Sequence, residues 1–129
     1  MKKFLILLFL SFFISEYTYA AGSSGGDGDG LKKTDYQKAV TLIKSAKKFE
    51  KKGKTDKAMK KYQEAKKLLI LSNETKPNKP DTLNYLGFTT RKLGDFENGE
   101  KYYLQGLSID PNHIGINEYL GELYVATKR

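Results

Sequence analysis

The sequence contains no cysteine and no tryptophan, and it has a single histidine among its 129 residues. The lack of cysteine excludes disulfide scaffolds, cysteine-ligated metals and thiol chemistry. One histidine cannot build a multi-histidine metal site, and a Ser–His–Asp triad would depend entirely on His113. The length fits one domain and a tail. We therefore predict a non-catalytic protein that needs no metal or cofactor.

Long apolar runs are also scarce, and the one that stands out lies near the N-terminus, from Phe4 to Ile14. As a helix it would span about 16 Å, roughly half of the hydrocarbon core of a bilayer. Two lysines precede it, and the small residues Thr18 and Ala20 follow it. This pattern is typical of a signal peptide over residues 1–20, with a retained membrane anchor as the alternative. We predict export to a bacterial periplasm or the extracellular space, with no stable membrane insertion after cleavage.

Residues 21–33 are predicted to form a flexible linker, since residues 22–30 read GSSGGDGDG and glycine loses the most backbone entropy on folding. Asp27 and Asp29 resemble the start of a calcium-binding EF-hand loop. However, Leu31 stands where a third ligand would be, and no glutamate closes a twelve-residue loop. We therefore predict no metal site here, and a helical domain over residues 34–129.

Charge is distributed unevenly along the chain. Residues 31–80 contain 16 lysines and 5 acidic residues, a net charge of +11, whereas residues 81–129 contain 5 basic and 7 acidic residues, a net charge of −2. The lysines crowd one predicted hairpin, at Lys47, Lys48, Lys51, Lys52, Lys54, Lys57, Lys60, Lys61, Lys66 and Lys67. Lysine without arginine is poorly suited to bidentate phosphate recognition. Solubility is the first interpretation, with no nucleic acid expected, and binding of an anionic envelope polymer or another polyanion is the alternative.

A period of 34 residues separates Gly87 from Gly121, and each glycine follows a Tyr-Leu pair. Two other segments share a spacing of four and then three residues, namely Ala58, Tyr62 and Ala65, and Gly99, Tyr103 and Gly106. Steps of three and four place residues on one face of a helix. The sequence therefore predicts a repeated helical unit.

Capping and stop signals divide the repeats into five antiparallel helices. Thr34 and Gln37 resemble a capping box that begins the first helix, and Gly53 ends it. The second helix is predicted to begin at Thr55, its cap, and to end at about Ser72. The third is predicted from Asp81 to Gly94, the fourth from Asp95 to just before Pro111, and the fifth from about Ile114 to the C-terminus. We predict an all-α array of helical hairpins, with His113 as a turn residue.

These residues resemble the tetratricopeptide repeat family, in which helices A and B form each repeat. The family motif has Leu-Gly or Leu-Ala on helix A, then Ala, an aromatic residue and Ala on helix B, and a closing Pro. The matching positions are Leu86, Gly87, Gly99, Tyr103, Gly106 and Pro111, and Thr90 departs at an aromatic position. Over residues 35–129 the resemblance implies an α-solenoid of about two and a half repeats. Small residues are required in it where helices A and B cross.

Two departures from the family pattern stand out. Ala46 and Gly87 are 41 residues apart, so the first repeat has seven extra residues. We predict that these partly extend the second helix and partly form a loop over residues 73–80. The third repeat has a helix A but no helix B. Either the array pairs with another chain there, as in a homo-oligomer through the C-terminal helix, or the chain is shorter than its relatives.

Helix A residues line the concave groove of this family, which implies a protein–protein interaction scaffold with a peptide or protein ligand. The corresponding residues are Ile43, Lys47, Glu50, Asn84, Phe88, Arg91, Glu118 and Glu122. An exposed Phe88 is predicted to anchor the ligand, with a partly buried rim residue as the alternative. The predicted core residues are Phe49, Ala58, Tyr62, Ala65, Leu86, Tyr103, Leu107 and Tyr124.

The best-known groove of the family binds a peptide carboxylate through lysine and asparagine side chains. Ile43, Tyr85, Gly115 and Tyr119 occupy four of its five clamp positions in this sequence, and Lys47 alone retains the expected polar character. Recognition of a chaperone tail by this clamp is therefore not expected.

Overall fold

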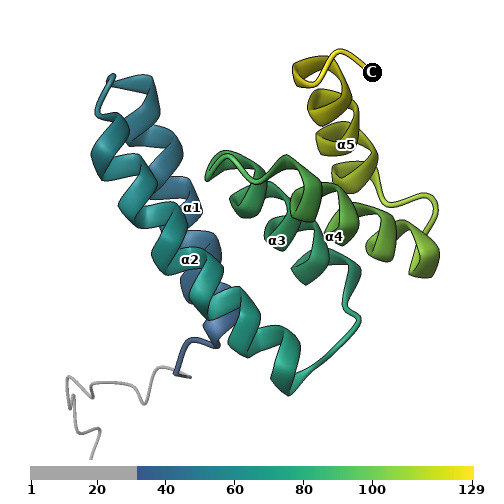
Figure 1. Ribbon diagram of the computed structural model, residues 1–129. Coiled ribbons are helices and arrows are strands. Elements are labelled where there is room, and N and C mark those ends of the chain that lie inside the picture. Colours follow the sequence, from purple (N-terminus) through teal and green to yellow (C-terminus); the bar gives the residue numbers. More distant parts are fainter. Residues whose placement is uncertain (1–31) are drawn as a thin grey trace, which may run out of the picture.

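The computed structural model describes residues 32–129, which form five α-helices joined by short turns (Figure 1). The helices are α1 (Asp35–Lys51), α2 (Thr55–Thr75), α3 (Pro80–Lys92), α4 (Phe96–Ile109) and α5 (Ile114–Ala126). These residues contain no strand, so the predicted all-α fold is confirmed. The predicted signal peptide and residues 21–31 of the predicted linker lie outside the described residues.

Each helix packs against the next, and the odd-numbered helices also contact one another in the order α1, α3, α5. In Figure 1 the α1–α2 hairpin lies beside the α3–α4 hairpin, and α5 stands at the far end of the array. Because α1, α3 and α5 occupy the positions of helix A in successive repeats, their side chains can combine into one surface.

The turns that end α1 and α3 share one geometry, which explains their glycines. Gly53 and Gly94 have φ values of +68° and +93°, in the left-handed region where glycine is favoured. The following residues donate back into the helix, with Lys54 N–H bonding Phe49 O at 2.9 Å and Asp95 N–H bonding Thr90 O at 3.1 Å. The end of α5 repeats this turn with Lys128 at φ +58°.

Helix starts follow the predicted capping in part. Thr34 and Gln37 form the predicted capping box, and Asp95 accepts a hydrogen bond from Asn98 N–H at 3.1 Å. The predicted cap at Thr55 is wrong, because Lys54 is the N-cap residue of α2 and makes no side-chain hydrogen bond there. The other predicted ends shift slightly: α2 extends to Thr75, α3 begins at Pro80, and α5 ends at Ala126.

The seven extra residues of the first repeat all lie in a helix. Helix α2 has 21 residues and α4 has 14, while residues 76–79 and residues 110–113 form connections of equal length. The predicted division between helix and loop is therefore corrected. Seven residues make about two α-helical turns, so the apolar face keeps its direction through the extension.

The core confirms the predicted crossing of helices A and B at Gly87. A Cβ atom added to Gly87 would lie 2.4 Å from Tyr103 Cε1, and Tyr103 is fully buried. Of the other predicted core residues, Ala58, Tyr62, Ala65 and Leu86 are buried. Phe49, Leu107 and Tyr124 are only partly buried, packing at the edges of the two apolar clusters.

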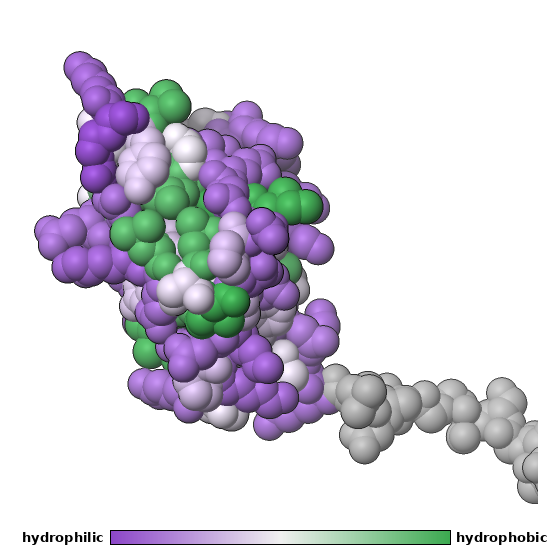
Figure 2. Space-filling view, turned by 90° about the vertical axis from the view of Figure 1, so that its right-hand side faces the viewer, coloured by the Kyte–Doolittle hydropathy of each residue, from purple (hydrophilic) through white to green (hydrophobic). Residues whose placement is uncertain are grey.

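The exposed side of α5 differs from the corresponding side of α3. A Cβ atom added to Gly121, 34 residues after Gly87, would have no neighbour within 4 Å, because no helix crosses it among the described residues. Ile114 and Val125 are 82% and 79% exposed. Figure 2, which views the right-hand side of Figure 1, shows hydrophobic side chains gathered in the middle of this face among hydrophilic ones.

Candidate ligand-binding surface

The helix-A face brings most of the predicted groove residues together. Phe88 on α3 lies at the centre of a set of rings and cations that we call the aromatic–cation cluster, which consists of Lys47, Tyr62, Phe88, Arg91, Lys92 and Tyr119. Glu50 and Glu122 are bonded to its edge. Side chains of α1, α3 and α5 that were predicted to share one surface therefore contact one another directly.

Phe88 is packed inside this cluster and is not exposed. It is 2% exposed, and its ring centroid lies 5.7 Å from that of Tyr62 and 4.8 Å from that of Tyr119. Both ring pairs lie within the range of favourable aromatic contacts. The prediction of an exposed anchor is wrong, because rings from α2 and α5 close over Phe88 from both sides.

Two of the three cations in the cluster are already paired. Arg91 Nη2 lies 2.7 Å from Glu122 Oε2, and Lys92 Nζ lies 2.9 Å from Glu50 Oε1. Glu50 also accepts a hydrogen bond from the Tyr62 hydroxyl at 2.8 Å. Burial and this bond to Glu50 raise the pKa of Tyr62 above its ordinary value, so the phenol stays protonated as a donor.

Lys47 is the cation of the cluster with no carboxylate within 4.0 Å in residues 32–129. Its ammonium group lies 4.6 Å from the centroid of the Phe88 ring and donates a hydrogen bond to the Tyr119 hydroxyl at 3.0 Å. An ammonium group has three donors. Lys47 can therefore keep its tyrosine contact and still bind an acceptor from outside the chain.

The other predicted groove residues are divided between the interior and the solvent. Ile43 and Asn84 are 2% and 7% exposed, so they belong to the packed interior and do not line a groove. Asn84 restricts α5 directly, since a Cβ atom on Gly115 would lie 2.7 Å from Asn84 Nδ2. Glu118 is exposed on α5.

His113 lies in a turn, as predicted, and also has a structural role there. Its Nδ1 accepts a hydrogen bond from Ile116 N–H at 3.1 Å, which caps α5. Its Nε2 lies 2.8 Å from Asp81 Oδ1 at the start of α3. The sequence does not predict this cap, because serine, threonine, asparagine and aspartate are the usual N-cap residues and histidine is not.

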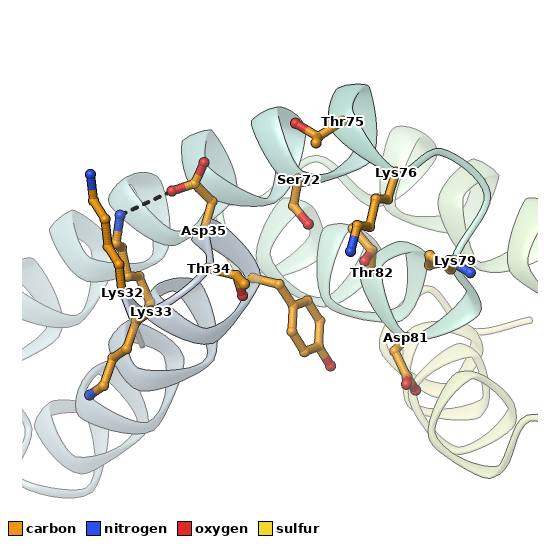
Figure 3. Close-up of a pocket in the computed structure, with 12 residues that line it drawn as sticks. Lys32, Lys33, Thr34, Asp35, Ser72, Thr75, Lys76, Lys79, Asp81 and Thr82 are labelled. Atoms are coloured by element: carbon orange, nitrogen blue, oxygen red, sulfur yellow. Dashed lines mark hydrogen bonds and ion pairs between the residues drawn. The ribbon is translucent and has the colours of Figure 1, made fainter. Parts of the chain in front are cut away.

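A separate hollow of about 610 Å³ lies where the start of α1, the end of α2 and the start of α3 meet. We call it the inter-hairpin pocket (Figure 3), lined by Lys32, Lys33, Thr34, Asp35, Tyr36, Lys38, Ser72, Thr75, Lys76, Lys79, Asp81 and Thr82. Burial, together with Asp81 and Tyr85, raises the pKa of Tyr36 to about 12. No pattern in the sequence predicts this pocket, because three separate helix ends build it.

Within residues 32–129, no group of three or more histidine, aspartate or glutamate side chains is placed to hold a metal ion. No helix in that range is long and apolar enough to cross a bilayer.

The contacts among α1, α3 and α5 are those of a helical-hairpin repeat, and comparison with known proteins agrees. Residues 81–113 match the tetratricopeptide repeat family. A solved structure of the first TPR of Spaghetti (RPAP3), bound to the HSP90 peptide SRMEEVD, is similar to this chain with a TM-score of 0.50 and 20% sequence identity. The likeness covers 74% of this chain and 100% of that chain. No curated protein matches the sequence. The chain thus has the fold of a TPR domain, with one repeat that matches the family directly.

Proposed function

We propose that this protein is a non-catalytic interaction module that binds a peptide or protein segment on the helix-A face. The observation that carries the proposal is the convergence of Lys47, Phe88 and Tyr119 from three different helices. A surface assembled from three rigid helices is pre-organised, which lowers the entropic cost of binding. The similar TPR structure that holds a peptide supports the same class of function.

The chemistry of the cluster favours a ligand that brings an acceptor to Lys47. Arg91 and Lys92 are already neutralised by Glu122 and Glu50, so the unpaired charge is that of Lys47. A carboxylate or backbone carbonyl of the ligand would bind this ammonium group, while apolar ligand atoms would pack beside Tyr119. The four altered clamp positions argue against recognition of a chaperone tail, which remains a prediction from the sequence.

Export and self-association belong to the same proposal. The signal-peptide pattern in residues 1–20 supports an exported module in the periplasm or outside the cell. The exposed side of α5, with Ile114 and Val125, supports a homo-oligomer that forms through this helix.

A peptide selection tests the proposed function. Random heptapeptides displayed on phage would be selected on the full chain, and the enriched peptides measured by fluorescence polarisation. We expect Lys47→Met to weaken binding about tenfold, because a charge-assisted hydrogen bond is worth roughly 1.5–3 kcal/mol. Methionine retains an apolar stem over the Phe88 ring.

Lys57→Met is the matched control, since Lys57 also lies over a phenylalanine ring, 5.9 Å from the centroid of Phe49, but outside the cluster. SRMEEVD serves as the comparison peptide. The proposal fails if no peptide is enriched above bait-free beads. It also fails if the two lysine variants weaken binding equally.

Binding of a polyanion is the second candidate function, and one observation favours it. Of the ten lysines crowded into the α1–α2 hairpin, only Lys61 lies within ion-pair distance of a carboxylate, that of Glu64, in residues 32–129. The others leave an uncompensated positive surface. Such a surface would bind an anionic envelope polymer with an affinity that falls steeply with salt.

Heparin chromatography distinguishes this second function from the first. If a polyanion is the ligand, we expect the chain to elute from heparin at a higher salt concentration than a neutral protein of equal size. Binding of a selected heptapeptide should change much less with salt, because it involves about one charge contact. Retention no stronger than that of the neutral protein would exclude the polyanion function.

A further inference from the structure

The inter-hairpin pocket contains a buried threonine whose hydroxyl has no partner among the described residues. Thr82 lines the pocket and is 4% exposed. Its hydroxyl makes no hydrogen bond to any residue from 32 to 129, unlike the hydroxyl of Thr89 on the same helix, which donates to Tyr85 O at 2.8 Å. The Thr82 hydroxyl is not among the fully buried side-chain atoms that lack a partner, so it is reached from the pocket. It is therefore free to bond to a ligand in the pocket.

Backbone donors lie beside this hydroxyl. The N-cap residue of α3, Lys79, makes no side-chain capping hydrogen bond, and Pro80 has no N–H. The N–H groups of Asp81 and Thr82, in the first turn of α3, have no intrahelical partner. The positive end of the helix dipole adds to their attraction for an anion.

The loop between α2 and α3 supplies a positive charge at the pocket, that of Lys76. Asn78 has a φ of +59° and accepts a hydrogen bond from Gln105 Nε2 on α4 at 3.1 Å, which ties the loop to the second hairpin. In Figure 3 the Lys76 side chain extends towards Thr82, whereas Lys32 and Lys33 extend away from the centre of the hollow. We therefore assign the central charge to Lys76.

The lysines that line the pocket outnumber its carboxylates, which are those of Asp35 and Asp81. Asp35 is bonded to Lys38 Nζ at 3.1 Å, and Asp81 lies 2.8 Å from His113 Nε2. By contrast, Lys32, Lys33, Lys76 and Lys79 have no carboxylate within 4.0 Å among the described residues. The pocket therefore has an excess of positive charge.

We propose that the inter-hairpin pocket binds the phosphate monoester of a small hydroxylated molecule. A lysine ammonium group, a threonine hydroxyl and two backbone N–H groups are all donors that a phosphate can accept from. No arginine lines the pocket to bind a planar carboxylate with two parallel hydrogen bonds. The volume of about 610 Å³ is far larger than phosphate alone needs. The hydroxyls of Ser72 and Thr75 and the ring of Tyr36 would contact the organic part.

Calorimetry and NMR on the full chain test this site with three probes: glycerol 3-phosphate, inorganic phosphate and glycerol. We expect glycerol 3-phosphate to shift the amide resonances of Lys76 and Thr82, inorganic phosphate to shift the same resonances with lower affinity, and glycerol to shift neither. Lys76→Gln should weaken binding about tenfold. Lys67→Gln, at an exposed position of α2 outside the pocket, should change it less than twofold.

Thr82→Val removes the hydroxyl at nearly constant volume and should also weaken binding, provided that circular dichroism shows a folded chain. If it does not fold, Lys76→Gln decides the test alone. The inference is overturned if none of the three probes shifts these amide resonances when the probe is added at 10-fold the protein concentration or more. It is also overturned if Lys67→Gln and Lys76→Gln weaken binding of glycerol 3-phosphate equally. Heptapeptide binding should survive Lys76→Gln, because that surface is separate from the pocket.

Discussion

Replacing Gly87 with leucine is expected to lower the free energy of unfolding by about 3 kcal/mol, near the upper end for overpacked cores. Even a single Cβ atom would lie 2.4, 2.5 and 2.9 Å from three atoms of the Tyr103 ring. Tyr103 is fully buried, so its ring cannot swing aside without opening the crossing of α3 and α4. Urea unfolding followed by circular dichroism measures the change.

Gly121→Leu is the matched control at the corresponding position of the next repeat. No atom lies within 4 Å of a Cβ atom there, and leucine favours a helix over glycine by up to about 1 kcal/mol. We expect the stability to stay constant or to rise slightly. The packing described for Gly87 would be contradicted if the two variants unfolded at the same urea concentration.

Replacing Phe88 with alanine is expected to cost about 3–5 kcal/mol, a large share of the stability of a small domain. The ring fills the space between Tyr62 and Tyr119 and lies beneath the ammonium group of Lys47. Its loss would leave a cavity at the point where α1, α2, α3 and α5 meet. The measurement is again urea unfolding.

Phe96→Ala provides the comparison, because Phe96 is 38% exposed at the start of α4. We expect this variant to lose much less stability. If Phe88→Ala lowered the free energy of unfolding by less than about 1 kcal/mol, the neighbouring side chains would have to repack around the missing ring, and the tight packing described for the cluster would be contradicted. Because Phe88 supports the fold, its removal cannot report on ligand contacts alone, and Lys47→Met is the better probe of the binding surface.

The sequence predicted the helical array well where a single residue dictates the local geometry. Gly53 and Gly94 adopt the left-handed turn that glycine permits, and Thr34 with Gln37 closes a capping box within four residues. These features depend on short-range chemistry, so they can be predicted from the order of residues alone. The crossing at Gly87 was instead implied by the resemblance to the tetratricopeptide repeat family, and the same contact is not found at Gly121 among residues 32–129.

The burial of individual side chains could not be predicted in the same way. Phe88 shares a helical face with Asn84 and Arg91, but whether that face is open depends on how closely α5 and α2 approach it. Rings from these two helices cover Phe88, while Arg91 remains 11% exposed at the edge. The inter-hairpin pocket could not be predicted for the same reason, since its walls come from three helix ends separated along the chain.

The uneven distribution of lysines gives the folded array an electric dipole along its length. The α1–α2 hairpin carries the excess of positive charge, and α5, with Glu118 and Glu122, stands at the opposite end (Figure 1). Near a negatively charged surface, such a molecule is turned before it makes contact, over distances of about one Debye length, roughly 10 Å at 0.1 M salt. We expect an anionic surface to select one orientation of the array, with the hairpin arriving first and the open side of α5 left facing the bulk solution.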